Sequence, residues 1–302
     1  MTFKGDTPGK KLARLETWRI IFDALGRDRF LSGRYLFLAG PDMGDASVLL
    51  GLGVPAERLV AVDYESVAAS SAAYSFPQVT VHHEDVLHTI ERACTEKTTY
   101  DAIFLDFCAP IIESNLDTVG LAILEGLSRS GIVACTFLAG REQDSTGGKR
   151  ASVLAMRNRV EAALKNLSIE DRKKWEDAIP YLARLSVLQK ELLQRTRPLG
   201  AVPVPLACIF YKSRSEGELK GMPMCTYIAR SVMNSKLSID DQLRVALEES
   251  PEIFFFDPST KELGEYAVKL TELNYDPKLL LNATKGTVAA WKAHASRGTY
   301  KP

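Results

Sequence analysis

Two stretches of the sequence place a glycine or a carboxylate directly after a run of apolar residues. Residues 37–45 carry Gly40 and Gly44, and residues 59–63 end in Asp63. A glycine in a strand-to-helix turn lets a ligand approach the backbone closely, and the helix that follows presents unpaired N–H groups. A carboxylate at a strand end can accept hydrogen bonds from both hydroxyls of a ribose. Together the two stretches predict a site for an adenosine-containing ligand.

Two further carboxylates follow the same pattern later in the chain. Asp85 lies in the segment HEDVL at residues 83–87, and Asp106 lies in the segment DAIFLDFCAP at residues 101–110. We expect both to converge on the edge that holds Asp63. The structural alternatives are an ordinary turn at Gly40 and a helix-capping role for Asp63, since aspartate is a preferred N-cap residue. The presence of all four features in one chain favours the binding site.

The elements that must position these residues alternate between strand and helix. Short runs rich in β-branched and aromatic residues are each followed by a helical pattern, which predicts right-handed crossovers. The predicted fold class is therefore α/β, with a doubly wound, mostly parallel sheet. Ligands of such sheets bind beyond the carboxyl ends of the strands. The expected strands are residues 35–39, 59–62, 79–82, 102–105 and 132–138, and the expected helices are residues 43–53, 66–74, 86–96 and 112–129.

The rest of the 302-residue chain adds peripheral elements to this sheet. Apolar residues at helical spacing predict an N-terminal helix over residues 11–26 and a helical insertion over about residues 150–195. The proline-containing stretch of residues 198–205 ends this helical pattern. Two strand-like runs predict an antiparallel hairpin at the sheet edge, formed by residues 207–212 and 224–232. We expect one α/β domain over residues 1–235 and a helical C-terminal extension over residues 236–302.

The segments AGPDMG, VAVD, HEDV and DAIFLDFCAP, in this order, resemble the motifs of the class I S-adenosylmethionine-dependent methyltransferases, which have a Rossmann-like fold. The resemblance spans roughly residues 34–233, and the hairpin is similar to the sixth and seventh strands of that family. It implies S-adenosylmethionine as the cofactor and methyl transfer as the reaction. The enzyme then mainly aligns an acceptor with a methyl group that is already activated.

The resemblance also implies roles for individual residues. Gly40 and its neighbours would approach the methionine end of the cofactor, Asp63 would bind the ribose, and Asp85 with Val86 would lie against the adenine. Asp106 and Phe107 would line the floor between cofactor and acceptor. The expected cofactor-binding residues are Ala39, Gly40, Pro41, Gly44, Asp63, Tyr64, Asp85, Val86 and Asp106, and the expected catalytic residues are Asp106, Phe107 and Pro110.

Two departures from the family pattern concern the first loop and the fourth motif. Pro41, Asp42 and Met43 stand where the family carries more glycine, and the amino-directed nucleic-acid enzymes have an acid or amide, two prolines and an aromatic where this chain has DFCAP. Cys108 offers an alternative chemistry, because cytosine C5 methylation uses a cysteine thiolate as nucleophile. The Pro-Cys order expected for that reaction is missing.

The C-terminal residues 279–300 look like a helix, a tight turn and a second short helix, which is similar to a helix-turn-helix. The alternative is a helical cap with a solvated basic face. The expected nucleic-acid contacts in this segment are Lys285, Lys292, His294 and Arg297.

Composition limits the remaining classes. The 38 basic and 38 acidic residues balance, which argues against a protein that coats polyanions generally. The five cysteines form no CxxC pair, so we expect no metal site and buried thiols in a reducing cytoplasm. No apolar run is long enough to cross a bilayer, and we expect a cytoplasmic protein without a membrane partner. The absence of a GxxxxGK[ST] loop and of a Gly-x-Ser-x-Gly elbow disfavours nucleotide hydrolysis and acyl transfer.

Three hypotheses for function follow. The first is an S-adenosylmethionine-dependent methyltransferase that acts on nucleic acid, either DNA or RNA. The second is a methyltransferase-like fold without turnover that serves as a nucleic-acid-binding or assembly module. The third is a nicotinamide-dependent oxidoreductase, which fits Gly40 and Asp63 but does not explain Asp85 or the antiparallel hairpin.

Overall fold

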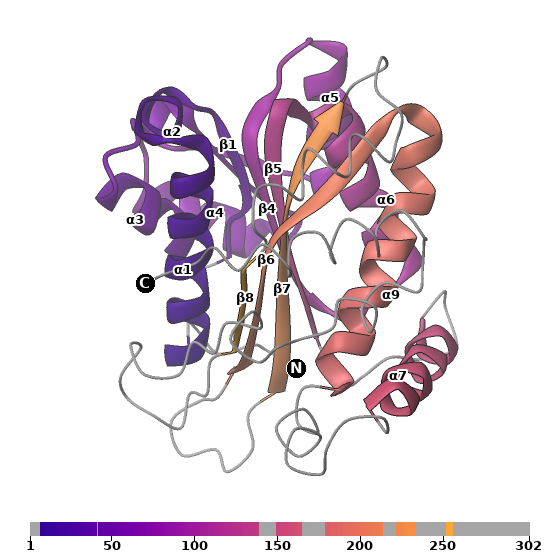
Figure 1. Cartoon of the computed structure of the whole chain (residues 1–302). Helices are drawn as coiled ribbons and strands as arrows, with labels where there is room; N and C mark the ends of the chain where they lie inside the picture. The colour runs from indigo at the N-terminus through magenta and orange to yellow at the C-terminus, as the bar shows by residue number, and fades with distance from the viewer. Residues whose placement is uncertain are drawn as a thin grey trace.

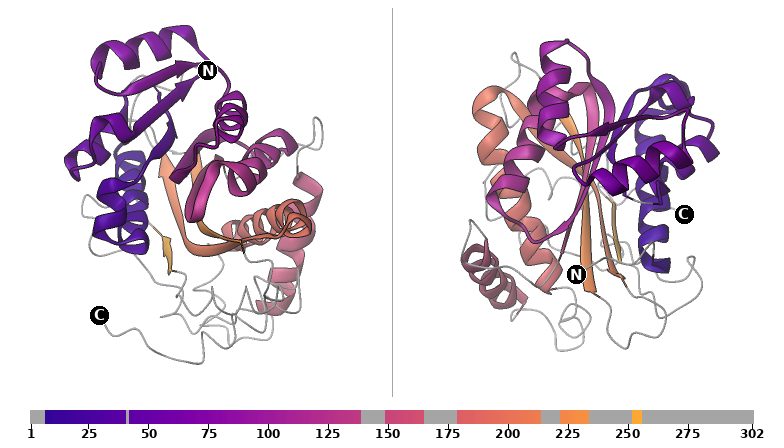
Figure 2. Two further views of the ribbon diagram at one scale, coloured as in Figure 1. Left: turned by 90° about the horizontal axis from the view of Figure 1, so that it is seen from above. Right: turned by 180° about the vertical axis from the view of Figure 1, so that it is seen from behind.

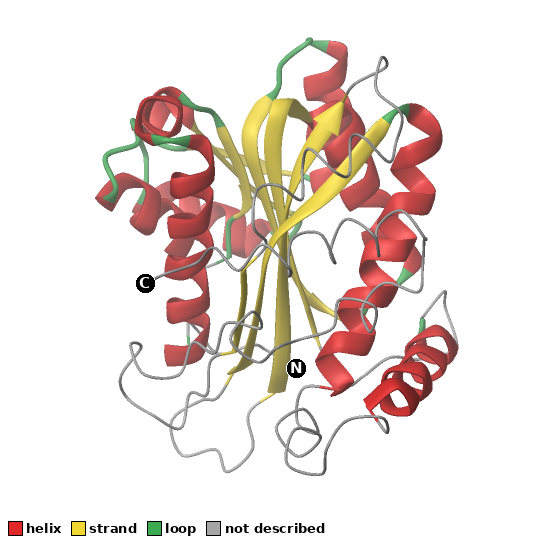
Figure 3. Cartoon of the chain, in the orientation of Figure 1, coloured by secondary structure: helices red, strands yellow, loops and turns green. Residues whose placement is uncertain are grey.

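One eight-stranded sheet forms the centre of the molecule, in the order β3-β2-β1-β4-β5-β7-β6-β8. The computed structural model describes residues 7–40, 42–138, 149–164, 179–213, 222–233 and 252–255. Figure 3 shows the strands between helices on both faces. The strands are β1 (Tyr35–Leu38), β2 (Leu59–Asp63), β3 (Thr80–His83), β4 (Tyr100–Ala109), β5 (Leu127–Leu138), β6 (Ala201–Ser213), β7 (Met222–Met233) and β8 (Glu252–Phe255).

The first five strands form the parallel part of the sheet. β1 pairs in parallel with β2 on one side and with β4 on the other, and β3 and β5 continue the sheet outward in parallel. The strand order therefore reverses between β1 and β4, which is where such sheets bind their ligands. β7 runs antiparallel between β5 and β6. The predicted α/β class, with a mostly parallel sheet and an antiparallel C-terminal hairpin, is confirmed.

Helices cover the two faces of the sheet in two groups (Figure 1 and Figure 2). Because side chains alternate along a strand, Tyr35 and Phe37 of β1 face one apolar core and Leu36 faces the other. The core around Tyr35 is covered by α1 (Pro8–Leu25), α2 (Arg27–Ser32), α3 (Gly44–Gly51) and α4 (Ser66–Ser75). The core around Leu36 is covered by α5 (Val86–Thr95), α6 (Glu113–Leu121), α7 (Arg150–Leu164) and α9 (Ile179–Thr196).

The β6 strand is longer than the sequence pattern indicated. It begins at Ala201 and so contains Pro203 and Pro205, which were expected to interrupt regular structure. Proline has no N–H to donate and is accepted where one side of a strand is unpaired. In the described residues β8 pairs only with the later part of β6, from Ala207 to Phe210, so this condition holds for the two prolines. The carbonyl oxygen of Pro203 accepts a hydrogen bond from Gln189 Nε2 at 2.9 Å.

Two other elements differ from expectation. Residues 252–255 form the strand β8, parallel to β6, within a stretch that we expected to be helical. Their sequence, Glu-Ile-Phe-Phe, is rich in the aromatic and β-branched residues that favour strands. The helix expected over residues 112–129 ends early, because a π-helical turn over Ala122–Gly126 leads into β5 at Leu127. The rest of the C-terminal extension lies outside the described residues.

In the described part of the chain, none of the helices combines the length and the apolar character needed to cross a membrane.

Candidate active site at the carboxyl edge of the sheet

Residues near the carboxyl ends of three neighbouring strands lie in one row. Leu38 of β1 lies beside Val62 of β2, and the backbone N–H of Ala39 donates to the Val62 carbonyl at 2.8 Å, so Ala39 follows beside Asp63. On the other side, Phe37 lies beside Phe104 of β4, which brings Ala39 level with Asp106. Adjacent strands lie about 4.8 Å apart, so the two carboxylates flank the end of β1 at a spacing of roughly 10 Å.

Both carboxylates belong to the same face of the sheet. Ala61 and Phe104, each two residues earlier in its strand, lie in the core that α1 covers. Side chains alternate along a strand, so Asp63 and Asp106 point to that face as well. The register therefore brings together Ala39, Asp63 and Asp106, three residues that the sequence analysis assigned to one site.

The turn after β1 has its backbone open to solvent or ligand. Gly40 has φ of +58°, and a Cβ atom built on it would meet no atom within 4 Å. Met43 also has a positive φ, of +46°, but its side chain is fully buried and anchors the turn in the apolar core. The backbone conformation thus favours glycine at position 40, and none of the described residues fills the space above it. Gly44 begins α3, and Pro41 lies outside the described residues.

Asp63 keeps one carboxylate oxygen available. Its Oδ1 accepts a hydrogen bond from the Glu65 backbone N–H at 2.9 Å, and within the described part of the chain Oδ2 has no hydrogen-bond partner. Tyr64, next to it, is 73% exposed, and its carbonyl oxygen accepts from His83 Nε2 at 3.1 Å. This bond ties the turn after β2 to β3.

Asp85 is the N-cap residue of α5. Its Oδ1 accepts from the Leu87 backbone N–H at 2.8 Å, and Val86 is buried in the core behind it. The structure thus gives Asp85 a capping contact through one oxygen, while the exposed carboxylate lies two residues beyond the end of β3. Because the cap uses only Oδ1, it is compatible with the ligand contact that the sequence analysis expected of Asp85.

The Asp106 carboxylate contacts two side chains, one through each oxygen. Its Oδ2 lies 2.7 Å from Lys10 Nζ, and its Oδ1 accepts a hydrogen bond from Cys108 Sγ at 3.1 Å. Lys10 Nζ also lies 3.5 Å from Cys108 Sγ. Lys10 was missed in the sequence analysis because the expected helix began at residue 11. Thr7 followed by Pro8 carried the missing signal, since Thr7 caps the helix and Pro8 is its first residue.

A β-bulge shapes this end of β4. Asp106 pairs with Thr136 of β5, and the next pair joins Ala109 to Phe137, so two residues are inserted between them. One of them, Cys108, has φ of +47°, a conformation that costs a non-glycine residue about 1–3 kcal/mol. Bulges of this kind re-aim side chains and are frequent next to active sites.

The other bulge residue, Phe107, lies against Phe137 with ring centroids 5.7 Å apart. It packs on the core that faces α6, whereas Asp106 faces α1. Pro110 follows β4 and is half-buried.

The charge states of the Asp106 partners follow from burial and from the carboxylate. Burial raises the pKa of the Cys108 thiol to about 12, and the Asp106 carboxylate adds to the shift. A reactive cysteine needs a lowered pKa, so the thiol of Cys108 does not have the state required of a nucleophile. Burial by itself would lower the pKa of Lys10, but the Asp106 carboxylate outweighs it and the pKa is raised. Lys10 is therefore an ammonium ion.

The helix α1 is also fixed to the first turn of α3. Arg14 Nε lies 3.2 Å from Asp45 Oδ2, and Trp18 Nε1 donates to Asp45 Oδ1 at 2.7 Å. Lys10, Arg14 and Trp18 follow one another at single-turn spacing on α1. Burial raises the pKa of Asp45, and the contacts with Arg14 and Trp18 oppose that shift. One face of α1 thus contacts both the helix after the glycine turn and the end of β4.

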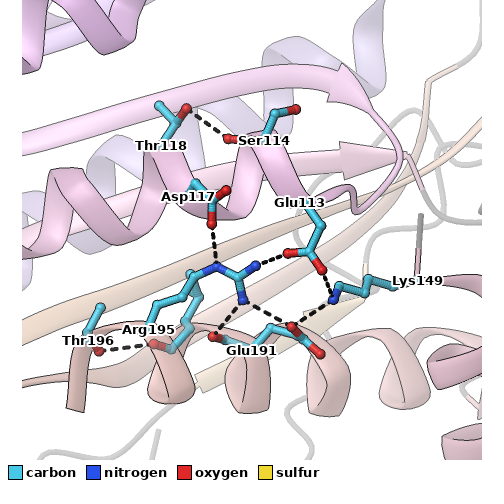
Figure 4. A network of polar contacts seen from close by, with 9 residues as sticks. Glu113, Ser114, Asp117, Thr118, Lys149, Glu191, Arg195 and Thr196 are labelled. Carbon is cyan, nitrogen blue, oxygen red and sulfur yellow. Dashed lines mark hydrogen bonds and ion pairs between the residues drawn. The ribbon is translucent and has the colours of Figure 1, made fainter. Parts of the chain in front are cut away.

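A charged network supports the segment after β4 from the other face (Figure 4). Glu113, in the first turn of α6, contacts both Lys149 and Arg195, and Arg195 also binds Asp117 at 2.8 Å. Glu191 lies 3.0 Å from each of the two cations. The Lys149 backbone N–H donates to the Ile111 carbonyl at 3.3 Å. The network therefore joins α6, α9 and the residue before α7.

Within the described ranges, histidine, cysteine and acidic side chains form no cluster of the kind that holds a metal ion. The predicted nucleic-acid contacts Lys285, Lys292, His294 and Arg297 lie outside the described residues.

No family model matches the chain, and no curated protein matches it. Among solved structures, it is similar to a candidate RNA methyltransferase from Pyrococcus horikoshii, with 12% identity, 72% of this chain and 84% of that chain covered, and a TM-score of 0.40. It is also similar to the N-methyltransferase NodS from Bradyrhizobium japonicum WM9 in complex with S-adenosyl-L-homocysteine, with 11% identity, 74% and 88% covered, and a TM-score of 0.38. Trm1 from Pyrococcus horikoshii with S-adenosyl-L-methionine is 14% identical, with 82% of this chain and 62% of that chain covered and a TM-score of 0.45.

Proposed function

We propose that this protein is an S-adenosylmethionine-dependent methyltransferase that acts on a nucleic acid. The observation that carries the proposal is the row formed by Asp63, Ala39 and Asp106 where the strand order reverses, next to the open backbone of Gly40. S-adenosylmethionine and its acceptor need a carboxylate for the ribose, an open backbone for the methionine chain and a polar group for the acceptor, all side by side. The order of motifs along the sequence supports the same assignment.

The residues present fit the cofactor. Among the described residues, Asp63 Oδ2 and one oxygen of Asp85 are left for hydrogen bonds after their contacts with Glu65 and Leu87. In this proposal Asp63 binds the ribose hydroxyls, Asp85 accepts from the adenine amine, and Gly40 lets the methionine end approach the backbone. The bound cofactor supplies an activated methyl group, and the chain supplies alignment and charge.

On the acceptor side, the proposal assigns Asp106 to the group that receives the methyl. A carboxylate oxygen has two acceptor directions, so Asp106 can accept from an amine or hydroxyl while Lys10 and Cys108 hold it. The nucleic-acid part of the proposal rests on the basic residues of the C-terminal segment in the sequence, which include Lys285 and Arg297.

Calorimetry with S-adenosylhomocysteine tests the cofactor assignment. We expect micromolar to submillimolar binding that Asp63→Ala weakens roughly 10- to 100-fold, as expected for hydrogen bonds to a charged group. Asp23→Asn, which changes an exposed carboxylate paired with Arg19, is the matched control and leaves the affinity unchanged. Absence of binding at millimolar ligand contradicts the proposal.

Transfer of a labelled methyl group to panels of DNA, RNA and protein tests the acceptor. We expect label in DNA or RNA. Label only in protein contradicts the nucleic-acid assignment. Salt-sensitive nucleic-acid binding without any transfer contradicts the enzymatic assignment and identifies the chain as a binding module.

A further inference from the structure

We propose that Lys10 of α1 is a positioning residue, which holds the Asp106 carboxylate in one orientation at the acceptor side of the site. This inference rests on the proposed function, because it gives Asp106 a partner needed for methyl transfer. It adds a residue from the N-terminal helix to a site otherwise built from strand ends.

The geometry of the contact supports a positioning role. Lys10 Nζ binds Asp106 Oδ2 at 2.7 Å, while Cys108 binds the other oxygen at 3.1 Å. Two donors on two different oxygens fix the rotation of a carboxylate about its last bond. A thiol is a weak donor, so Cys108 alone would leave that rotation loosely defined. Lys10 therefore supplies most of the restraint.

Charge on this side of the sheet points to the same role. Asp106 and Asp45 are two carboxylates that face α1, and their side chains are only 11% and 4% exposed. Each carboxylate has its own cation on α1, Lys10 for Asp106 and Arg14 for Asp45, and the two cations are one helical turn apart. Without Lys10, Asp106 would lie largely buried with no cation from the described residues in contact, and an unpaired buried carboxylate is costly, so its side chain would be free to turn toward another donor.

The position of α1 on the sheet does not depend on the contact between Lys10 and Asp106. Arg14 and Trp18 bind Asp45 and keep α1 on the sheet, and Thr7 caps its first turn. Removal of the Lys10 ammonium therefore changes the partner of Asp106 and leaves α1 attached. This separates a positioning role from a structural one.

The contact itself can be tested without activity. Reductive methylation of lysines with formaldehyde and a borane, read by peptide mass spectrometry, compares Lys10 with its exposed neighbour Lys11. We expect Lys10 to react at least several-fold more slowly than Lys11 in the unmodified protein, and the difference to shrink in Asp106→Asn. Equal reactivity in the unmodified protein overturns the pair and the inference with it.

The role is tested by steady-state transfer to the best acceptor from the nucleic-acid panel. We expect Lys10→Met to lower kcat roughly 10- to 100-fold, in line with the cost of a misplaced reacting group, with S-adenosylhomocysteine affinity within about twofold. Lys10→Arg should restore most of kcat, and Lys11→Met, the control on the same helix, should leave it unchanged. In the Asp106→Asn background, Lys10→Met should have little further effect.

The outcomes separate the two proposals. An unchanged kcat in Lys10→Met, or an equal further loss in the Asp106→Asn background, overturns the positioning role while the methyltransferase assignment stands. Protection of Lys10 together with no methyl transfer by the unmodified protein overturns the proposed function, and the positioning role falls with it.

Discussion

Trp18 of α1 donates its indole N–H to Asp45 of α3 at 2.7 Å, and both side chains are buried. The bond joins the N-terminal helix to the turn that carries Gly40, through the first turn of α3. Trp18 also packs edge-on against Tyr35 and Phe104, so its ring holds the helix on β1 and β4.

Trp18→Phe removes this hydrogen bond while it keeps an aromatic ring. We expect a loss of about 2–4 kcal/mol in the free energy of unfolding, from the buried acceptor that loses a donor and from the smaller ring. Urea denaturation followed by circular dichroism measures it. Tyr64→Phe, which removes a polar atom from an exposed ring, should change stability by less than about 0.5 kcal/mol.

Gly40→Ala tests whether the open backbone after β1 serves a ligand. Its φ of +58° predicts a cost of about 1–2 kcal/mol for any side chain, although a Cβ atom there meets nothing within 4 Å. Gly200→Ala is the matched control, because Gly200 has φ of +84°, an equally free Cβ position and a place before β6 at the opposite edge. Both variants should lose similar stability, but only Gly40→Ala should weaken S-adenosylhomocysteine binding. Equal affinities would remove Gly40 from the site.

The row of Ala39, Asp63 and Asp106 could be predicted from the sequence because it depends on strand order and strand ends. The apolar runs in β1, β2 and β4 are short and are followed by a glycine or a carboxylate, so the ends of these runs are visible in the pattern, although β4 itself continues past Asp106 to Ala109. Once the strands are parallel neighbours, the residues that follow them must lie along one edge.

The contacts of Asp106 could not be predicted in this way. Its bulge depends on pairing with Thr136 and Phe137 of β5, which no local pattern encodes. Its partner Lys10 comes from the N-terminal helix, almost a hundred residues earlier in the chain. Lys10 and Cys108, the two side chains that hold Asp106, are separated by 98 positions. The early part of β6 could not be predicted either, because prolines disfavour a strand locally. The unpaired side of β6 that accepts Pro203 exists only in the assembled sheet.

Glu84, beside Asp85, gives a pH-dependent prediction. Burial by itself raises the pKa of Glu84, but hydrogen bonds from Thr89 and Arg92 outweigh it and lower the pKa below the usual value. A lowered folded-state pKa contributes stability above the unfolded value of 4.5 that is lost as pH falls through the folded value. Glu84→Gln should therefore cost about 1 kcal/mol at pH 7, after allowance for partial exposure, and progressively less as the pH falls below 4.5.

Thermal or urea unfolding at pH 7 and at about pH 3 measures this difference. Glu91→Gln, an exposed position on α5, is the control and should show less than about 0.5 kcal/mol at either pH. A cost for Glu84→Gln that is the same at pH 7 and pH 3 would contradict the assigned contacts.

Cys108 should resist alkylation at pH 8, because burial and the nearby Asp106 carboxylate raise its pKa to about 12. Asp106→Asn removes the carboxylate and should speed alkylation of Cys108. Cys94, which is exposed and contacts Glu125 instead of Asp106, should keep its rate. Iodoacetamide labelling with peptide mass spectrometry measures both sites. Rapid labelling of Cys108 in the unmodified protein would reopen the nucleophile alternative.

Arg195 and Lys149 should stabilise the segment after β4 as a unit, because both cations share Glu113 and Glu191 (Figure 4). Arg195→Met should lower the free energy of unfolding by about 1–3 kcal/mol, less than a fully buried pair would cost, since Glu113 is 45% exposed. Lys149→Met should cost a similar amount.

The effects of substituting side chains that share partners are not additive, so the double variant should differ from the sum of the single variants by about 0.5 kcal/mol or more. Arg157→Met, which breaks an exposed pair with Glu161 on α7, is the control at less than about 0.5 kcal/mol. Strict additivity of Arg195→Met and Lys149→Met would mean that the two cations act on α6 independently, and that Glu113 does not couple α9 to the start of α7.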